Sequence, residues 1–256
     1  MALIQLDHKP ITTKVNTPVR VILPDFFSDE IPDLQSCQVL FLLHGLSDDA
    51  SAWQRYTNIE SLVRYKPVMV VMPSVGRSFY TDMDNGQAYY TYLTQELPQY
   101  LETVFRVDLS EKKQLIAGIS MGGFGAFKIA LLNPERFRAA LSLSGVLSLQ
   151  VFSPANLTLE QESDRHEFDL VFGGLDKLAG SENDPAVWIK KAALDPSRIP
   201  GLAMACGKQD SLLPANRWFF NEALNAQLSI RYRESDGGHD WLFWGEQIRI
   251  WLEEVL

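Results

Sequence analysis

Cysteine is scarce in this sequence of 256 residues, and no segment that would direct export is expected in it. The two cysteines, Cys37 and Cys206, both lie inside apolar runs. This placement is typical of buried strand residues in a reducing compartment, so neither a disulfide nor a catalytic thiol is expected. The first residues, MALIQLDHKP, include an early aspartate and lack the apolar stretch of a secretory signal.

Basic clusters and long apolar runs are missing as well. The 23 lysines and arginines are outnumbered by 32 aspartates and glutamates, which gives a net charge of −9. Because phosphate backbones and anionic bilayers attract clustered basic residues, neither a nucleic acid nor a membrane is an expected partner. The longest uninterrupted apolar runs, such as VMVVM at 68–72, fall far below the roughly 18 residues of a transmembrane helix. These absences indicate a soluble, cytoplasmic protein.

The apolar residues that are present predict strands alternating with helices. Strands are expected at 3–8, 18–23, 39–43, 68–72, 113–117, 137–143, 201–206 and 228–233. Helices are expected at 50–63, 88–105, 185–193, 214–226 and 241–255, and another is expected to begin after residue 120 and to end near 133. Pro98 would kink the helix at 88–105. The alternation predicts an α/β fold, with a mostly parallel sheet covered on both faces and antiparallel strands at its N-terminal edge. No linker is evident. We therefore expect one domain over 1–256, with about 145–185 inserted over the sheet near the active site.

A nucleophile elbow is predicted in Leu115–Ala130, which reads LIAGISMGGFGAFKIA. An apolar strand meets a helix of small residues through the pentapeptide GISMG, and this arrangement places a serine on a strained turn with its hydroxyl exposed. Gly118 and Gly122 would flank Ser120 because the turn leaves no room for a Cβ atom. The five-residue pattern is weak by itself, but the strand before it and the helix after it make it specific. Ser120 is the predicted nucleophile.

A base for this serine can be found by elimination, since the chain has four histidines. His8 lies in the N-terminal edge segment, and His166 lies in the polar insertion. His44 ends a central strand, but it precedes the serine, and its pairing with a glycine suits a turn. His239 follows the last predicted strand in a GGHD loop, where the carboxyl ends of parallel strands form sites. The order Ser, acid, His of α/β-hydrolases therefore selects His239.

The acid that orients the base should lie between Ser120 and His239. Asp210 follows strand 201–206 through a short GKQ loop, again at a strand end. Asp236 is too close to His239 in the chain for an inward orienting role, and Asp195 precedes its strand. Four further aspartates belong to the insertion: Asp164, Asp169, Asp176 and Asp184. Asp210 is the predicted acid, and a solvated loop aspartate is the alternative.

Acyl transfer also needs donors for a developing oxyanion. The backbone N–H of Met121, directly after the nucleophile, should be one, and Leu46 N–H in the loop after His44 the other. Because this loop reads HGLS rather than HGGG, a neighbour of Leu46 is the alternative. Aromatic residues could line an acyl pocket or belong to the core: Trp53, Tyr80, Tyr89, Tyr90 and 218–220.

Four segments carry a resemblance to a known family: FLLHGLSDDASAW at 41–53, GISMGGFGA at 118–126, ACGKQDSLL at 205–213 and GGHDWLFW at 237–244. They resemble the esterase D-like branch of the α/β-hydrolases, which includes tributyrin esterases, S-formylglutathione hydrolases, feruloyl esterases and mycolyltransferases. Residues 78–98 are similar to the tributyrin-type esterases in particular. The resemblance implies an α/β-hydrolase fold, the triad Ser120, Asp210 and His239, oxyanion donors at Leu46 and Met121, and a homo-oligomer.

Two departures narrow the expected activity. Formylglutathione hydrolases usually have histidines where this chain has Ile119 and Phe124, and mycolyltransferases are exported. We therefore expect a serine carboxylesterase that hydrolyses short-chain acyl esters of small molecules through an acyl-enzyme. No metal or organic cofactor is expected, because no cluster of metal ligands appears in the sequence. The alternatives are a thioesterase such as an S-formylglutathione hydrolase, an acyltransferase, and a non-catalytic binding protein on the same fold.

Overall fold

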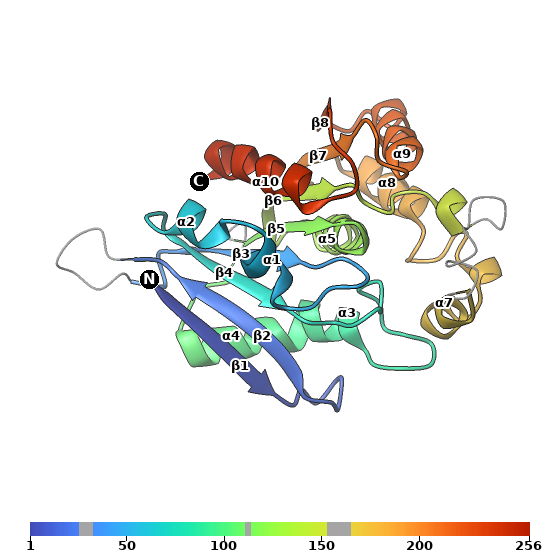
Figure 1. The fold of residues 1–256 in the computed structure, drawn as a ribbon. Helices are drawn as coiled ribbons and strands as arrows, with labels where there is room; N and C mark the ends of the chain where they lie inside the picture. Colours follow the sequence, from blue (N-terminus) through green and yellow to red (C-terminus); the bar gives the residue numbers. More distant parts are fainter. Residues whose placement is uncertain (26–32, 111–113, 153–164) are drawn as a thin grey trace.

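One eight-stranded sheet organises the computed structural model, which describes residues 1–25, 33–110, 114–152 and 165–256 (Figure 1). The strand order is β1-β2-β4-β3-β5-β6-β7-β8. β1 pairs antiparallel with β2, and β2 with β4, whereas all other neighbours are parallel. The strands are β1 Ala2–His8, β2 Thr17–Leu23, β3 Gln38–Leu43, β4 Val68–Pro73, β5 Gln114–Ile119, β6 Phe137–Leu143, β7 Gly201–Gly207 and β8 Ile230–Ser235. The predicted sheet, parallel with an antiparallel N-terminal edge, is confirmed.

Helices cover both faces of the sheet because its central strands are apolar on both sides. In β3, Leu40 and Leu42 pack in one core with α1, α2 and α10, whereas Val39 and Phe41 pack in the other with α4, α5, α8 and α9. The helices are α1 Ala52–Tyr56, α2 Ile59–Val63, α3 Tyr89–Thr91, the π-helix η1 Tyr92–Glu96, α4 Leu97–Phe105, α5 Met121–Leu132, the 3₁₀ helix η2 Leu149–Phe152, α7 Arg165–Phe172, the 3₁₀ helix η3 Leu175–Lys177, α8 Pro185–Leu194, α9 Leu213–Asn225 and α10 Trp241–Val255.

Two predicted elements differ from the structure. The helix expected at 50–63 is two helices, because Thr57 is extended and its hydroxyl accepts a hydrogen bond from Ile59 N at 3.2 Å. The strand expected at 228–233 begins only at Ile230. Gln227 is left-handed, with φ 61°, and Leu228 N donates to Ala223 O at 2.9 Å, which closes α9 with a Schellman-type cap.

The insertion predicted at about 145–185 lies partly outside the described residues, since 153–164 are not among them. Its described parts contain η2, α7 and η3. The aromatic residues Phe168 and Phe172 of α7 contact the ring of Phe79 with centroids 5.5 and 5.3 Å apart, which joins α7 to the rest of the molecule. The single domain over 1–256 stays a prediction.

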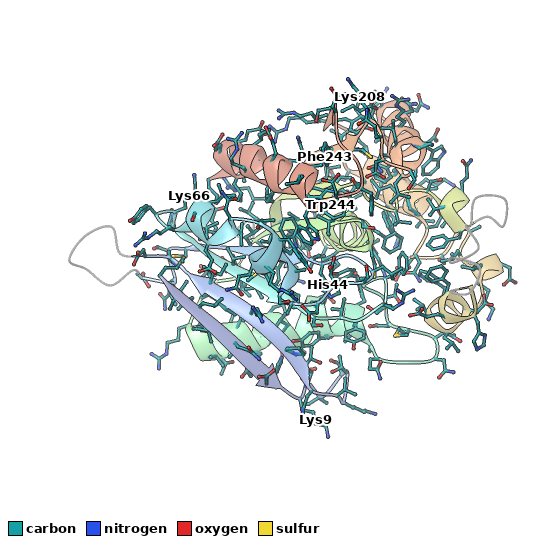
Figure 2. All side chains as sticks on the ribbon, viewed as in Figure 1. Lys9, His44, Lys66, Lys208, Phe243 and Trp244 are labelled. Atoms are coloured by element: carbon teal, nitrogen blue, oxygen red, sulfur yellow. The ribbon has the colours of Figure 1, made fainter. Side chains whose placement is uncertain are left out.

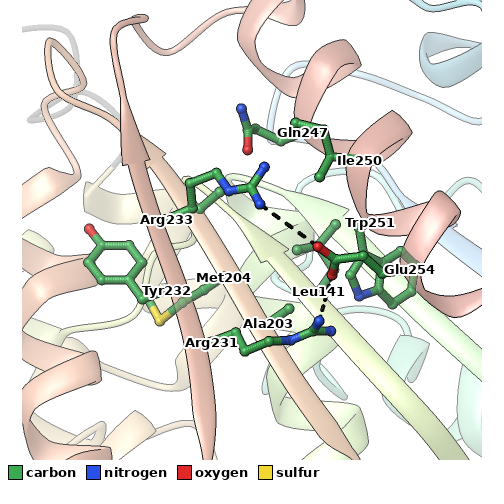
Figure 3. A pocket seen from close by; sticks show the side chains of 11 residues that line it. Leu141, Ala203, Met204, Arg231, Tyr232, Arg233, Gln247, Ile250, Trp251 and Glu254 are labelled. Atoms are coloured by element: carbon green, nitrogen blue, oxygen red, sulfur yellow. Dashed lines mark hydrogen bonds and ion pairs between the residues drawn. The ribbon is translucent and has the colours of Figure 1, made fainter.

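The edge strand β8 carries charge on its side facing α10. Arg231 and Arg233 both reach Glu254, with closest N–O distances of 2.6 and 3.8 Å, and Leu141 and Trp251 lie near this carboxylate (Figure 3). These side chains line a hollow of about 110 Å³ that does not include Ser120 or His239. Charged side chains on an edge strand discourage pairing with further strands.

Within the described ranges, no helix is long and apolar enough to cross a membrane.

The helix predicted at 88–105 is continuous but changes its hydrogen bonding before Pro98. Leu97 N donates to Tyr92 O, five residues back, so the chain forms a π-helix at 92–96. Proline has no N–H for the carbonyl four residues before it, which is that of Thr94. Arg136 Nη1 donates to this carbonyl at 2.7 Å, and its Nη2 donates to Gln114 Oε1 at 2.9 Å. The side chain of the residue directly before β6 therefore replaces the hydrogen bond that the proline cannot form.

Replacing Arg136 with alanine should destabilise the fold, because it leaves the Thr94 carbonyl without its donor inside the protein. We expect a loss of about 1–3 kcal/mol in the free energy of unfolding, measured by urea denaturation. Arg138→Ala provides a matched control, since Arg138 is exposed and should change stability by less than about 0.5 kcal/mol. Equal losses in the two variants would contradict this role of Arg136.

Candidate active site

Ser120 occupies a strained turn between β5 and α5. Its backbone angles are φ 52° and ψ −118°, a conformation that residues other than glycine rarely adopt. A Cβ atom on Gly118 would lie 2.1 Å from Gly122 O, and one on Gly122 would lie 2.4 Å from Leu43 O. Strand and helix therefore approach so closely that only glycine fits on either side of Ser120, as the sequence predicts.

Three side chains that the sequence selects meet at the carboxyl ends of the parallel strands. His239 Nε2 lies 3.0 Å from Ser120 Oγ, and His239 Nδ1 lies 2.9 Å from Asp210 Oδ2. Ser120 follows β5, Asp210 follows β7 and His239 follows β8. The Asp210 side chain is fully buried, whereas that of His239 is 35% exposed. The three groups thus form one chain of hydrogen bonds from the interior to the surface.

Asp210 is held as a carboxylate by its neighbours. Burial favours its neutral form, but hydrogen bonds from His239, from the Ser144 hydroxyl and from Leu212 N outweigh burial and lower its pKa. The Leu212 N–H donates to Asp210 Oδ1 at 2.8 Å. A charged carboxylate here orients the imidazole with its proton on Nδ1, which leaves Nε2 free to accept from Ser120.

Two residues that sequence reasoning did not identify connect Asp210 and His239. Trp244 Nε1 donates to Ser144 Oγ at 3.0 Å, and the Ser144 hydroxyl in turn hydrogen-bonds Asp210. The Trp244 ring also meets His239 edge-on, with centroids 4.8 Å apart. The five-residue spacing from His239 to Trp244, within the GGHDWLFW segment, is the only signal in the sequence that could have suggested this tryptophan. For Ser144 the sequence carries no signal.

The other aspartates near His239 have different roles. Asp240 caps α10, because its Oδ1 accepts hydrogen bonds from Leu242 N and Phe243 N at 3.0 Å each. Asp236 pairs with Lys208 at 3.4 Å, and its side chain is 85% exposed. Asp240 therefore fixes the start of the helix directly after His239, whereas Asp236 lies at the surface.

The two predicted oxyanion donors lie beside the serine. Leu46 and Met121 line the same hollow as Ser120 and His239. Met121 is the first residue of α5, so its N–H has no partner within the helix. Within the described ranges, neither this N–H nor that of Leu46 donates to another group. Both are thus available to an oxygen atom bound next to Ser120.

His44 anchors the loop that carries Leu46, and it lies in the middle of the molecule (Figure 2). Its Nδ1 donates to Gly45 O at 2.7 Å, and its Nε2 accepts from Val75 N at 3.1 Å. The Tyr80 hydroxyl donates to the His44 carbonyl at 2.9 Å. Burial lowers the pKa of His44 to about 4, so the ring is neutral and holds the loop as both a donor and an acceptor.

An apolar hollow of about 160 Å³ opens beside Ser120. Phe79, Phe152 and Phe168 form its aromatic wall, with each pair of ring centroids 5.5 Å apart. None of the aromatic residues that the sequence offered for an acyl pocket lines this hollow, and they pack in or against the cores, which is the second of the two alternatives: Trp53, Tyr80, Tyr89, Tyr90 and 218–220. Tyr80, for example, is fully buried beneath the loop of His44.

The part of the chain that the structure describes contains neither a disulfide nor a cluster of side chains that could bind a metal ion. Cys37 and Cys206 are buried and unpaired by any disulfide. No group of three or more histidine, cysteine, aspartate and glutamate side chains there lies close enough together to hold a metal ion.

Residues 12–250 match the model of a protein family described as "Putative esterase". The chain belongs to this esterase family. The esterase is also 31% identical over 265 residues to an acetyl esterase of Caldicellulosiruptor saccharolyticus, an alignment that covers 100% of the chain and 99% of that relative.

Solved structures of two Staphylococcus aureus proteins share the fold. One is FphF, a fluorophosphonate-binding serine hydrolase, with 30% identity and a TM-score of 0.87. The other is an S-formylglutathione hydrolase, with 31% identity and a TM-score of 0.85. Each alignment covers 98% of the esterase and 97% of the other chain. The predicted esterase D-like family, the α/β-hydrolase fold and the class of carboxylic ester hydrolases are thereby confirmed.

The neutral His44 predicts a dependence of stability on acid. Its pKa is about 4 in the folded chain and ordinarily 6.5, so between these values only the unfolded chain binds the proton. Stability contributed by His44 is therefore lost as the pH falls from about 6.5 to about 4. Urea denaturation at pH 7 and pH 4.5 should show that His44→Gln, although less stable at pH 7, loses less stability on acidification than the wild type.

The exposed His166 on α7 supplies the control for this measurement. His166→Gln should retain the loss of stability that the wild type shows between the two pH values. An undiminished loss in His44→Gln would mean that another group carries the dependence.

Proposed function

We propose that the esterase is a serine carboxylesterase for short-chain acyl esters, with Ser120 as nucleophile, His239 as base and Asp210 as the orienting acid. The observation that carries this proposal is the hydrogen-bond chain from Ser120 Oγ through His239 to the buried Asp210, at 3.0 and 2.9 Å. A serine hydroxyl becomes nucleophilic when a base in contact with it removes its proton. The ester would bind in the apolar hollow that Ser120 borders.

In the first half-reaction, Ser120 Oγ attacks the ester carbonyl carbon while His239 Nε2 takes the hydroxyl proton. The carbonyl oxygen becomes an oxyanion and accepts hydrogen bonds from Leu46 N–H and Met121 N–H. One such donor contributes a factor of about 10²–10³ to kcat in serine hydrolases. The bond from the carbonyl carbon to the alcohol oxygen then breaks, and His239 gives its proton to the departing alcohol.

In the second half-reaction, water takes the place of the alcohol. His239 removes one proton from the water as its oxygen attacks the acyl carbon, and the same N–H groups hold the second oxyanion. The bond to Ser120 Oγ breaks, Oγ regains its proton from His239, and the carboxylic acid leaves. Asp210 remains charged throughout and stabilises the imidazolium in both halves.

A preference for short acyl groups is supported by the shape of the hollow. The rings of Phe79, Phe152 and Phe168 line it and pack against one another, and Phe79 and Phe168 meet edge-on. Because closely packed rings cannot move apart without losing contacts, a long acyl chain would have no space beyond them.

Hydrolysis of a thioester is the second candidate, favoured by the structural likeness to an S-formylglutathione hydrolase at 31% identity. The same serine, base and N–H groups can attack either kind of ester. Ile119 and Phe124 stand next to the nucleophile in place of the histidines usual in that group, and both are almost fully buried. Neither offers a polar contact to a glutathione moiety, so we favour the oxygen ester.

Substitutions in the triad test the assignment of roles. Ser120→Ala and Asp210→Asn should each lower kcat for 4-nitrophenyl acetate on the order of 10⁴-fold or more. A fluorophosphonate should add its mass to the wild type but not to Ser120→Ala. Asp236→Asn is the matched control and should keep kcat. Covalent labelling that survives in Ser120→Ala, or a collapse of kcat in Asp236→Asn alone, would refute these roles.

A second experiment tests the substrate class with acetyl, butyryl, hexanoyl and octanoyl esters of 4-nitrophenol. We expect kcat/KM to fall beyond butyryl, and Phe168→Ala to move the optimum to longer chains because it removes one ring of the wall. Phe220→Ala, on a ring outside the hollow, should leave the optimum unchanged. A higher kcat/KM for S-formylglutathione than for every oxygen ester would favour the second candidate instead.

A further inference from the structure

A buried lysine lies on α5, the helix that begins directly after Ser120. Lys128 is only 3% exposed. Its Nζ donates to Tyr80 O at 3.2 Å and to Asn183 Oδ1 at 2.7 Å, and it lies over the ring of Tyr90, 4.7 Å from the centroid. Lysine is rarely buried this completely, because burial takes the amine out of water. Both acceptors are neutral oxygens, so these hydrogen bonds are not ion pairs.

The carbonyl that Lys128 holds belongs to a strained pair of residues. Phe79 and Tyr80 are both left-handed, with φ 50° and 54°. Residues other than glycine rarely adopt this conformation, and two in succession cost free energy that surrounding contacts must offset. Tyr80 N donates to Ser78 Oγ at 3.2 Å, within the same turn. The hydrogen bond from Lys128 ties the turn to α5.

One face of α5 is shaped to receive this pair. The Phe124 ring meets the Phe79 ring edge-on, with centroids 5.6 Å apart. A Cβ atom on Gly125 would lie 2.4 Å from Tyr80 Cγ, so the glycine leaves room for the tyrosine ring. Lys128 follows Phe124 by four residues and Gly125 by three, and this spacing places all three on the same side of a helix. A ring contact, a gap and a hydrogen bond thus fix the pair from one side.

Each member of the pair reaches a different part of the site. Phe79 lines the apolar hollow that Ser120 borders. The Tyr80 hydroxyl donates to His44 O at 2.9 Å, at the start of the loop that carries Leu46. A displacement of the pair would therefore move both the wall of the acyl pocket and the loop of one proposed oxyanion donor.

We propose that Lys128 is a positioning residue of the esterase, which holds the Tyr80 carbonyl and thereby fixes the acyl wall through Phe79 and the oxyanion loop through the Tyr80 hydroxyl. The inference rests on the proposed function, because it gives Phe79 and Leu46 the roles described there. Lys128 does not line the hollow beside Ser120, so it acts through the pair and not on the ester.

The two hydrogen bonds do not require a charged lysine. Burial lowers the pKa of Lys128 to about 7, although Asp82 and Glu182 act in the opposite direction. A neutral amine keeps two N–H groups, which is enough for the Tyr80 carbonyl and the Asn183 amide oxygen. A substitution, rather than a change of pH, is therefore needed to remove both bonds.

Lys128→Met tests the proposal, because methionine has a similar length but no N–H group. For 4-nitrophenyl acetate we expect kcat to fall about tenfold or more while KM stays within about twofold, since an oxyanion donor acts mainly in the transition state. The ratio of kcat/KM for the hexanoyl ester to that for the acetyl ester should rise about threefold or more, because Phe79 is less firmly held. A mere loss of folded enzyme would lower kcat equally for both esters and leave this ratio unchanged.

Tyr80→Phe separates the two effects, since it removes only the hydroxyl that bonds His44 O. It should lower kcat for every ester and leave the hexanoyl-to-acetyl ratio as in the wild type. In the double variant, kcat should fall no more than about twofold below that of Lys128→Met, because both changes release the same loop. Losses of kcat that multiply would mean that Lys128 acts independently of Tyr80, which contradicts the proposal.

An exposed lysine close by in the chain provides the control. Lys191 pairs with Glu182 at 2.9 Å, and Lys191→Met should keep both kcat and the ratio. Asn183→Ala removes one of the two acceptors of Lys128 and lies in a half-buried turn. It should cause the same two changes to a smaller extent, and it replaces Lys128→Met as the test if that variant does not fold by circular dichroism.

Two further results would overturn the proposal: an unchanged kcat in Lys128→Met, or a fall in kcat/KM that is equal for the acetyl and hexanoyl esters. If the wild type hydrolyses the acetyl ester, either result defeats only the role of Lys128. If the wild type hydrolyses no ester and a fluorophosphonate fails to label Ser120, the proposed function fails as well.

Discussion

The left-handed backbone at Ser120 is the constraint on which the rest of the site depends. A residue other than glycine in such a conformation costs about 1–3 kcal/mol, and surrounding contacts must compensate. Here Ser120 N donates to Leu143 O on β6 at 2.9 Å, and α5 packs against the ends of β3 and β5 through Gly118 and Gly122. The same turn that strains the serine raises its hydroxyl out of the sheet and directs the first N–H of α5 toward the same space. The proposed nucleophile and one of the proposed oxyanion donors are thus two consequences of one turn.

The other groups of the site hold one another in place. Trp244 supports the Ser144 hydroxyl and the His239 ring, and Ser144 bonds the carboxylate that orients the same ring. On the opposite side, the neutral His44 and the Tyr80 hydroxyl fix the loop that presents Leu46. Since each contact limits the freedom of the next, substitutions within this network should not have additive effects. The proposed roles therefore belong to the connected set more than to any single side chain.

Chain order was sufficient to bring Ser120, Asp210 and His239 together, because in a parallel sheet the loops after successive strands meet at one edge. The elbow glycines were predictable for a similar reason, since a tight turn between strand and helix excludes a Cβ. Sequence reasoning failed for contacts between segments that are far apart in the chain. Nothing local indicates that Tyr80 bonds His44, that Arg136 replaces the hydrogen bond missing at Pro98, or that phenylalanines from three segments form one wall. These contacts depend on how the helices and loops pack against the sheet, and the spacing of apolar residues along the sequence does not indicate that packing.

The loop after β3 holds one of the two proposed oxyanion donors in place. Leu46, in this loop, borders the apolar hollow together with Ser120. His44, at the start of this loop, is buried and neutral, and its Nδ1 donates to the carbonyl of Gly45, directly before Leu46. An oxyanion donor stabilises a transition state only if it is already in place, so the loop cannot be free to adapt to each alcohol. The buried contacts of His44 therefore serve the proposed reaction by keeping the Leu46 N–H in one place before the ester binds.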